Sequence, residues 1–140
     1  MDPLDRFVAA QARDYAIALA ELQRGRKTSH WIWYVFPQIA GLGRSDMARH
    51  YAIADLDEAR AYLAHPLLGA RLGEATTALL AHAGKRSAEA ILGGIDAIKV
   101  RSSMTLFEVA DGAAGGVFAA CLDAFYAGSR DPETLRRITC

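Results

Sequence analysis

Aromatic and histidine side chains crowd into the stretch SHWIWYVFPQ, residues 29–38, which holds both tryptophans of the chain. On a helix, His30, Trp33 and Tyr34 fall on one side. Histidine transfers protons near neutral pH without help, so His30 is a candidate catalytic residue. Trp33 and Tyr34 are candidates for stacking against a bound heterocycle. The alternative is a helix buried on all sides whose polar atoms are satisfied within the core, and the sequence leaves both interpretations open.

A second polar row lies in the segment DAIKVRSSMTLF. On a helix, Asp96, Lys99 and Ser103 share one face, with Ser102 beside them. Asp96 and Lys99 are candidate catalytic residues, Asp96 as an acid or base and Lys99 as a charge clamp, with Arg101 as the alternative clamp. Arg101 and both serines are candidate ligand-binding residues. A serine four residues from a lysine is also typical of a serine nucleophile with a lysine base, which requires a desolvated lysine. The alternative is an Asp96–Lys99 surface pair worth about half a kcal/mol, with solvated serines.

The loop QIAGLGRSD follows the aromatic stretch and supplies the candidate ligand-binding residues Gln38, Gly41, Gly43 and Ser45. Glycines let a backbone approach a ligand closely, and a helix that begins near Ser45 presents free N–H groups to an anion. Neither nucleotide-binding pattern, G-x-x-x-x-G-K-[ST] or G-x-G-x-x-G, is present. An ordinary glycine turn with a Ser or Asp cap explains the loop equally well.

These candidates must be positioned by helices. Trp, Ile, Tyr, Val and Phe favour strands, yet the chain contains no second strand-like run to pair with the aromatic stretch. We therefore predict a short buried helix there, capped by Thr28 or Ser29 and ended at Phe36 by Pro37. The remaining periodic, capped segments predict helices over residues 3–24, 46–54, 56–64, 66–82, 87–92, from 96 onward, 113–127 and from 131 onward. The expected fold is all-α: one domain over residues 1–140, a bundle of about seven or eight helices.

Composition excludes several classes of protein. The 140 residues are 52% hydrophobic, and 16 basic residues balance 16 acidic ones at a pI near 6.9, which argues against nucleic-acid binding. No apolar run is long enough to cross a bilayer, and no secretory signal begins the chain. Neither the two cysteines nor the four histidines have metal-ligand spacing. We expect a cytoplasmic monomer or small homo-oligomer without metal or cofactor.

The segments GRKTSHWIWYVFPQIAGLGRS, EARAYLAHPLLGARL and DAIKVRSSMTLFE resemble a bacterial family catalogued as domain of unknown function 1810. The resemblance runs from FVAAQARDY to DPETLRRI, with one departure at GGID, residues 93–96. It implies a small helical protein and no function. Some members are labelled calpastatin, but calpain inhibitors of that name are disordered and polar, unlike this chain. A looser likeness, without matching residues, links the chain to N-glycosidase-like proteins of the NADAR and YbiA type, which act on ribosylated metabolites.

Three functions fit these patterns. The first is a small-molecule pocket for a nucleotide-like or sugar-phosphate ligand, as in a hydrolase or N-glycosidase-like enzyme. The second is a protein-interaction module or homo-oligomer, and the third is an accessory protein whose motifs are purely structural. Convergence of the candidate residues on one cavity favours the first. We expect Trp31 and Phe107 to be buried, and His30 to border a pocket toward which Lys99 and the two serines point.

Overall fold

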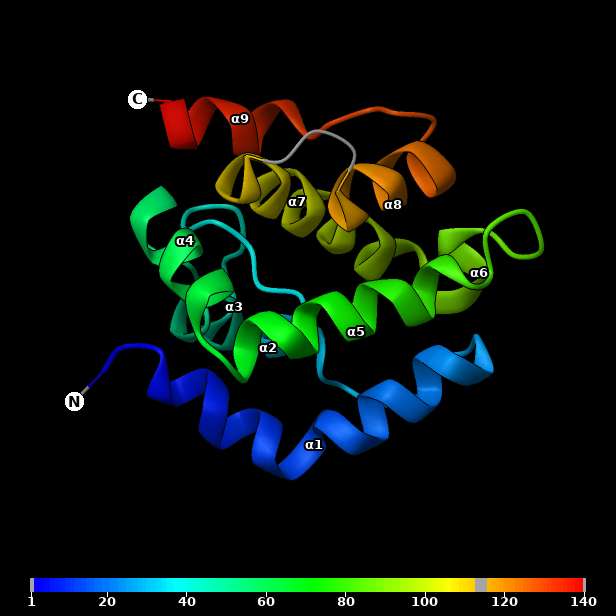
Figure 1. Ribbon diagram of the computed structural model, residues 1–140, viewed down its shortest axis with the longest axis horizontal. Coiled ribbons are helices and arrows are strands. Elements are labelled where there is room, and N and C mark those ends of the chain that lie inside the picture. Colours follow the sequence, from blue (N-terminus) through cyan, green and yellow to red (C-terminus); the bar gives the residue numbers. More distant parts are fainter. Residues whose placement is uncertain (1, 113–115, 140) are drawn as a thin grey trace.

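The computed structural model describes residues 2–112 and 116–139 (Figure 1). This part of the chain forms nine helices: α1 (Asp5–Arg24), α2 (Ile32–Val35), α3 (Asp46–His50), α4 (Leu56–Ala64), α5 (Leu68–Leu80), α6 (Ala88–Leu92), α7 (Gly94–Asp111), α8 (Val117–Tyr126) and α9 (Pro132–Thr139). The expected all-α fold is confirmed, and each of the nine helices corresponds to a segment expected to be helical, one more than the total of seven or eight. No helix in these two ranges is both long and apolar enough to cross a membrane.

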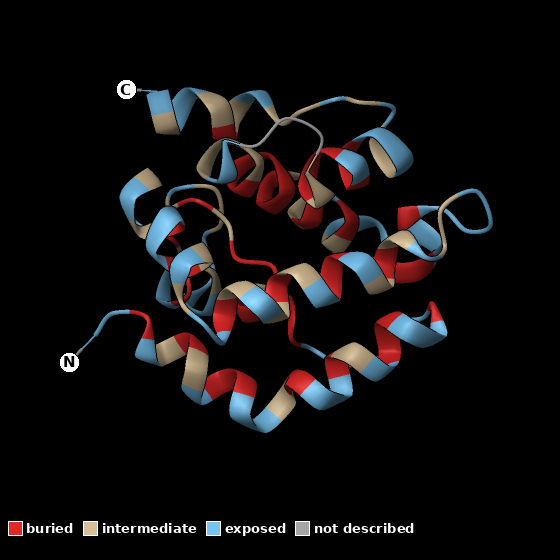
Figure 2. Ribbon diagram, in the orientation of Figure 1, coloured by how far each residue is buried: buried red, intermediate tan, exposed pale blue. Residues whose placement is uncertain are grey.

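Helix α7 is the centre of the molecule. It contacts α2, α4, α6, α8 and α9, while α5 packs between α1 and α8 (Figure 1). Buried residues are concentrated on α7 and on the inward sides of α1 and α5 (Figure 2). The segment DAIKVRSSMTLF therefore belongs to the helix with the most neighbours, and this helix is open to solvent in its first turns and again at its last residue, Asp111.

The aromatic stretch forms a shorter helix than expected. Only Ile32–Val35 is helical, and neither Thr28 nor Ser29 caps it. The predicted cap is wrong because the helix begins only at Ile32, while the Ser29 hydroxyl and the backbone N–H groups of Thr28 and Ser29 donate to the carboxylate of Glu21. The chain up to Trp31 is thus tied to α1 rather than wound into a helix.

Several helix boundaries also differ from the expected ones. The helix predicted over 46–54 ends at His50, because Ile53 forms a bridge with Ile39 in which its N–H donates to the carbonyl of Gln38. The first helix begins at Asp5, because the Asp2 carboxylate accepts from the N–H of Leu4 in a preceding turn. The central helix begins two residues before Asp96, and the eighth begins at 117, with residues 113–115 outside the described ranges.

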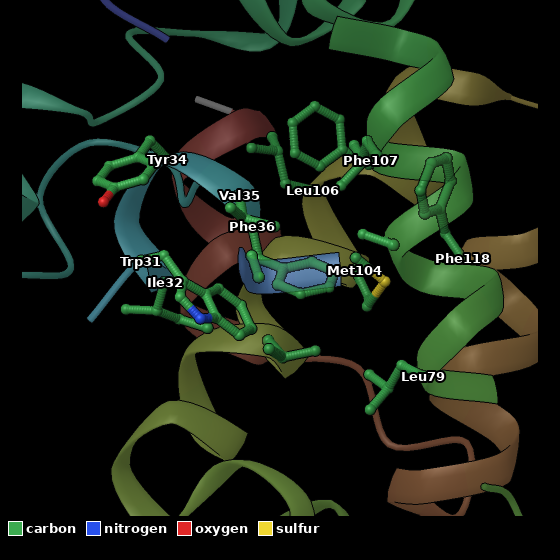
Figure 3. Packing of buried hydrophobic residues seen from close by; sticks show 14 of the residues in the cluster. Trp31, Ile32, Tyr34, Val35, Phe36, Leu79, Met104, Leu106, Phe107 and Phe118 are labelled. Carbon is green, nitrogen blue, oxygen red and sulfur yellow. The ribbon is translucent and has the colours of Figure 1, made fainter. Parts of the chain in front are cut away.

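The core is aromatic and continuous across the layers. Trp31 is 1% exposed and Phe107 0%, which confirms both as core residues. Phe107 contacts Tyr62 and Phe118, with ring centroids 5.3 and 6.0 Å apart. Figure 3 shows the rings of Phe107 and Phe118 in one cluster with Phe36 and the buried α2 residues Ile32, Tyr34 and Val35. This cluster holds the inner side of α7 rigidly against the aromatic segment.

Candidate functional site

A cavity of about 470 Å³ lies between the segment that precedes α2 and the first turns of α7. Its lining brings together the three candidate catalytic residues, His30, Asp96 and Lys99, with the candidate ligand-binding residue Trp33. The remaining lining residues are Lys27, Thr28, Ser29, Ile32, Leu92, Gly93, Gly94 and Ile95. This convergence is the arrangement on which the small-molecule interpretation depends, while the role of each residue remains a prediction.

Asp96 stands between two lysines. Its carboxylate lies 2.8 Å from the ammonium of Lys27 and 3.6 Å from that of Lys99. Lys27 is held further by the carbonyl of Ser29, to which it donates at 2.5 Å, and by the face of Trp31, 5.0 Å away. The two ammonium groups outweigh the single carboxylate by one positive charge, so the cavity favours an anion.

Lys99 is the less restrained of the two lysines. Its ammonium lies over the ring of Trp33, 5.2 Å from the centroid, and its side chain is partly open to solvent. Because a cation covers this ring face, a base cannot stack there unless Lys99 moves. The indole N–H of Trp33 is buried and has no partner among the described residues. The pair therefore supplies a positive charge to the cavity rather than a free stacking surface.

His30 lies at the exposed edge of this cavity. Its carbonyl accepts from the hydroxyl of Tyr34 at 3.2 Å, whereas its imidazole makes no hydrogen bond or ion pair within the described ranges. A histidine ring that is open to solvent and free of partners is available to bind a ligand or to transfer a proton.

Sequence reasoning missed Glu21, which holds the cavity wall in place. The side chain is almost fully buried, and its carboxylate accepts from Thr28 and Ser29, from the Ser29 hydroxyl at 2.5 Å and from the indole N–H of Trp31 at 3.0 Å. Burial by itself raises the pKa of Glu21, but these donors outweigh it and lower the pKa to about 2. The available signal was an acid on the apolar face of the first helix, beside Leu22 and one turn after Ala18.

A second cavity of about 330 Å³ adjoins the first, because Ile95 and Lys99 line both. It contains three further candidate ligand-binding residues, Gln38, Gly43 and Ser102. Leu42, Ile98, Asp131 and Glu133 complete its lining. Seven of the twelve candidate residues thus line one or both of two neighbouring cavities on one side of α7.

Of two other candidate residues, Arg101 has partners within the fold, whereas the Ser103 hydroxyl is buried without a hydrogen-bond partner among the described residues. Arg101 donates to the carbonyl and hydroxyl of Ser129, at 2.8 and 2.7 Å, and to the carbonyl of Arg130 at 2.7 Å. Ser103 is fully buried, because the side of α7 that is open at Lys99 is covered one turn later. Neither residue lines the two cavities, so Arg101 anchors the chain before α9 instead of forming a charge clamp there.

The Tyr34 side chain also faces away from the cavity. Its hydroxyl donates to the carboxylate of Asp14 on α1, and Figure 3 shows its ring directed away from Phe36. Burial raises the pKa of Tyr34 above its ordinary value, and the nearby Asp14 carboxylate adds to the rise. Tyr34 therefore joins α1 to α2, and it does not line the cavity that Trp33 lines.

Packing explains much of the glycine loop. Gly41 has a φ of +96°, and the guanidinium of Arg137 fills the place of a Cβ atom, 2.3 Å from its ideal position. A Cβ on Gly43 would meet the Cβ of Ala48 at 2.4 Å. Ser45 caps α3 by accepting from the N–H of Ala48 at 3.1 Å. Gly41 and Ser45 lie outside both cavities, so the loop is built mainly for close contact within the chain.

No three His, Cys, Asp or Glu residues in the described ranges are grouped so that they could hold a metal ion. The site as built offers ammonium, imidazole, carboxylate and amide groups. These groups can bind an anion and exchange protons with it.

Comparisons with known proteins agree with this architecture. The chain is similar to the crystal structure of the conserved hypothetical protein Rv1873 from Mycobacterium tuberculosis, with 46% sequence identity, a TM-score of 0.94 and 99% of each chain covered. No curated protein matches it. Residues 1–138 match the model of a family described as "Protein of unknown function (DUF1810)". The chain therefore belongs to the DUF1810 family.

Proposed function

We propose that the cavity lined by His30, Asp96 and Lys99 binds a small anionic metabolite, either nucleotide-like or a sugar phosphate. The observation that carries this proposal is the Lys99 ammonium, which lies over Trp33 inside the cavity and is joined to Asp96 only across 3.6 Å. A partly open cation in a concave site attracts a phosphate or carboxylate group. The cavity volume is within the range of about 300–1,000 Å³ that is usual for ligand sites.

The enzymatic form of this proposal is a hydrolase, such as an N-glycosidase-like enzyme acting on a ribosylated metabolite. His30 is assigned the proton transfer, since its imidazole is free and accessible. Lys99 binds the anionic group of the ligand. Asp96 holds Lys99 in place and offers a carboxylate to positive charge on the sugar, although Lys27 at 2.8 Å already neutralises part of its charge.

Binding is tested with ribose 5-phosphate by thermal shift and calorimetry. We expect the ligand to raise the melting temperature of the natural protein, because binding stabilises only the native state. Lys99→Met should abolish the rise, and His30→Ala should reduce it, each with a nearly unchanged melting temperature without ligand. Lys85→Met removes an exposed lysine that lines neither cavity and serves as the control. An equal response in Lys99→Met and Lys85→Met would overturn the proposal.

Hydrolysis is tested separately by incubating the protein with ADP-ribose and with nucleoside monophosphates and separating the products by chromatography. Release of a base or of free ribose phosphate, lost in His30→Ala, is the expected result. Binding without any product would support the ligand-binding proposal and contradict its enzymatic form.

A second candidate function is protein interaction, favoured by two exposed isoleucines on α7. Ile95 is 73% exposed and Ile98 67%, and one helical turn separates them. If they form an interface between copies, Ile98→Ser should convert an oligomer to a monomer in light scattering. A natural protein that is monomeric at high concentration would exclude self-association through this face.

A further inference from the structure

We infer that the two adjoining cavities form one groove, in which the second cavity takes a flat heterocycle with an amino group, such as adenine, joined to the anion bound at Lys99. This inference rests on the proposed function, because it takes the position of the anion from that proposal. It adds the chemical class of the rest of the ligand: an aminopurine nucleotide rather than a simple sugar phosphate.

The two cavities are continuous at α7. Ile95 and Lys99 line both of them, so a ligand whose anionic group meets Lys99 has its remainder directed along the same helix face. One direction leads toward His30 and Asp96, and the other leads toward Gln38 and Asp131. The second cavity is also large enough by itself, about 330 Å³, for the base of a nucleotide.

The middle of the groove is apolar and exposed. Ile95 and Ile98 project from α7 with 73% and 67% of their surface in solvent, and Leu42 lines the same cavity from the glycine loop. Large aliphatic side chains left in water gain free energy when a flat apolar surface covers them. A heterocycle can stack on these isoleucines without a free aromatic ring. This matters because the Lys99 ammonium already lies over the ring of Trp33.

Polar groups with unused bonding capacity border this apolar surface. The side-chain amide of Gln38 makes no hydrogen bond within the described ranges. Asp131 accepts from Ser102 and Thr134 at its Oδ2 atom, whereas no donor from the described residues reaches its Oδ1 atom. Glu133 is already paired with Arg137 at 3.0 Å. The groups available for recognition are therefore one amide and one carboxylate oxygen.

An amide beside a carboxylate selects the edge of a base. A glutamine amide can donate to a ring nitrogen of adenine and accept from its amino group at the same time. The free oxygen of Asp131 offers a further acceptor to such an amino group, and the groove thus has a cation at one end and an acceptor at the other. A purely aliphatic ligand would leave Gln38 and Asp131 buried without partners, which is unfavourable.

The experiment compares AMP, IMP and ribose 5-phosphate by calorimetry on the full chain. The expected order of affinity is AMP above IMP above ribose 5-phosphate, with AMP at least about tenfold tighter than the sugar phosphate. Ile98→Ser should bring AMP to the level of ribose 5-phosphate and leave ribose 5-phosphate unchanged. Gln38→Leu should remove the preference for AMP over IMP.

Matched controls come from α1, where Ile17 and Gln23 are both exposed. Ile17→Ser and Gln23→Leu should leave all three affinities unchanged. If ribose 5-phosphate binds through Lys99 but AMP binds no tighter, this inference is overturned and the proposed function stands. Equal weakening of all three ligands by Ile98→Ser would likewise overturn it, and the absence of any binding would overturn both.

Discussion

Glu21 is the residue on which the wall of the candidate site depends. It is a buried carboxylate that accepts hydrogen bonds from two backbone N–H groups, a hydroxyl and an indole. Charge-assisted hydrogen bonds of this kind are stronger than neutral ones, and the donors lose their partner together if the carboxylate is removed. The conformation of the segment from Thr28 to Trp31 therefore depends on its hydrogen bonds to the Glu21 carboxylate.

Glu21 should make the fold sensitive to acid. Its pKa falls from 4.5 to about 2 on folding, so its contribution is complete above pH 4.5 and is lost as the pH falls toward 2. We expect the free energy of unfolding, measured with urea, to decline between about pH 5 and pH 2. In Glu21→Gln the protein should be less stable near neutral pH, by about 2 kcal/mol, with a flatter decline. Glu89→Gln, at an exposed glutamate, should follow the natural protein.

Arg101 separates a structural role from a ligand-binding role. Because its guanidinium holds the carbonyls of Ser129 and Arg130, Arg101→Met should lower the free energy of unfolding by about 2 kcal/mol. Amide hydrogen exchange should become faster in α9, while the affinity for ribose 5-phosphate stays unchanged. If Arg101→Met keeps its stability but loses affinity for ribose 5-phosphate, Arg101 binds the ligand and its role is not structural.

At this scale the sequence was informative only where partners are close along the chain. The ion pair of Asp96 and Lys99 was one of two interpretations of their spacing, and the cap at Ser45 was one of two interpretations of the glycine loop. The structural role of Arg101 could not be predicted, since its acceptors lie 28 and 29 residues away in the sequence. Glu21 was missed although its donors follow within 7 to 10 residues, because an acid on the apolar face of the first helix does not show which later turn supplies its donors.

At the scale of the element, two glycines in α5 play opposite roles. A Cβ on Gly69 would lie 2.1 Å from the backbone carbonyl oxygen of Leu63, so this glycine permits the contact between α4 and α5. A Cβ on Gly73, one turn later, would meet no atom within 4 Å. The same substitution is therefore expected to act in opposite directions at two positions of one helix.

Gly69→Ala should destabilise the protein by about 2 kcal/mol or more, because backbone atoms must move apart to admit the methyl group. Gly73→Ala should instead stabilise it by about 1 kcal/mol, since alanine is the better helix former. Denaturant unfolding of the two variants side by side measures both changes. Equal effects would show that α4 and α5 do not approach each other as closely as described.

Element types were predictable because most helices carry their own signals. Caps at Ser45, Asp55 and Ser87 and the left-handed turn at Gly25 are all encoded locally. The conformation of the aromatic stretch was harder to predict, because its residues favour a strand but the sequence offers no second strand-like run to pair with it. The structure has a four-residue helix within this stretch and, after Pro37, an isolated β-bridge from Ile39 to Ile53.

At the scale of the whole molecule, the site is a consequence of the core. The aromatic cluster buries the inner side of α7 along much of its length (Figure 3), while the first turns of the helix stay open at Ile95 and Ile98. The Lys27–Asp96 pair joins this open end to the segment after α1. The cavity therefore exists where two parts of the chain meet at the edge of the packed interior.

Phe107 tests whether this core acts as one unit. Its ring contacts Tyr62 of α4 and Phe118 of α8, so removing it opens a void shared by three helices. Phe107→Ala should lower the free energy of unfolding by about 3 to 5 kcal/mol, in a single denaturant transition whose slope is unchanged. Phe125→Ala, at a half-buried ring on α8, should cost clearly less. Equal costs, or a second transition in the natural protein, would mean that α7 is not the shared centre on which both the fold and the groove depend.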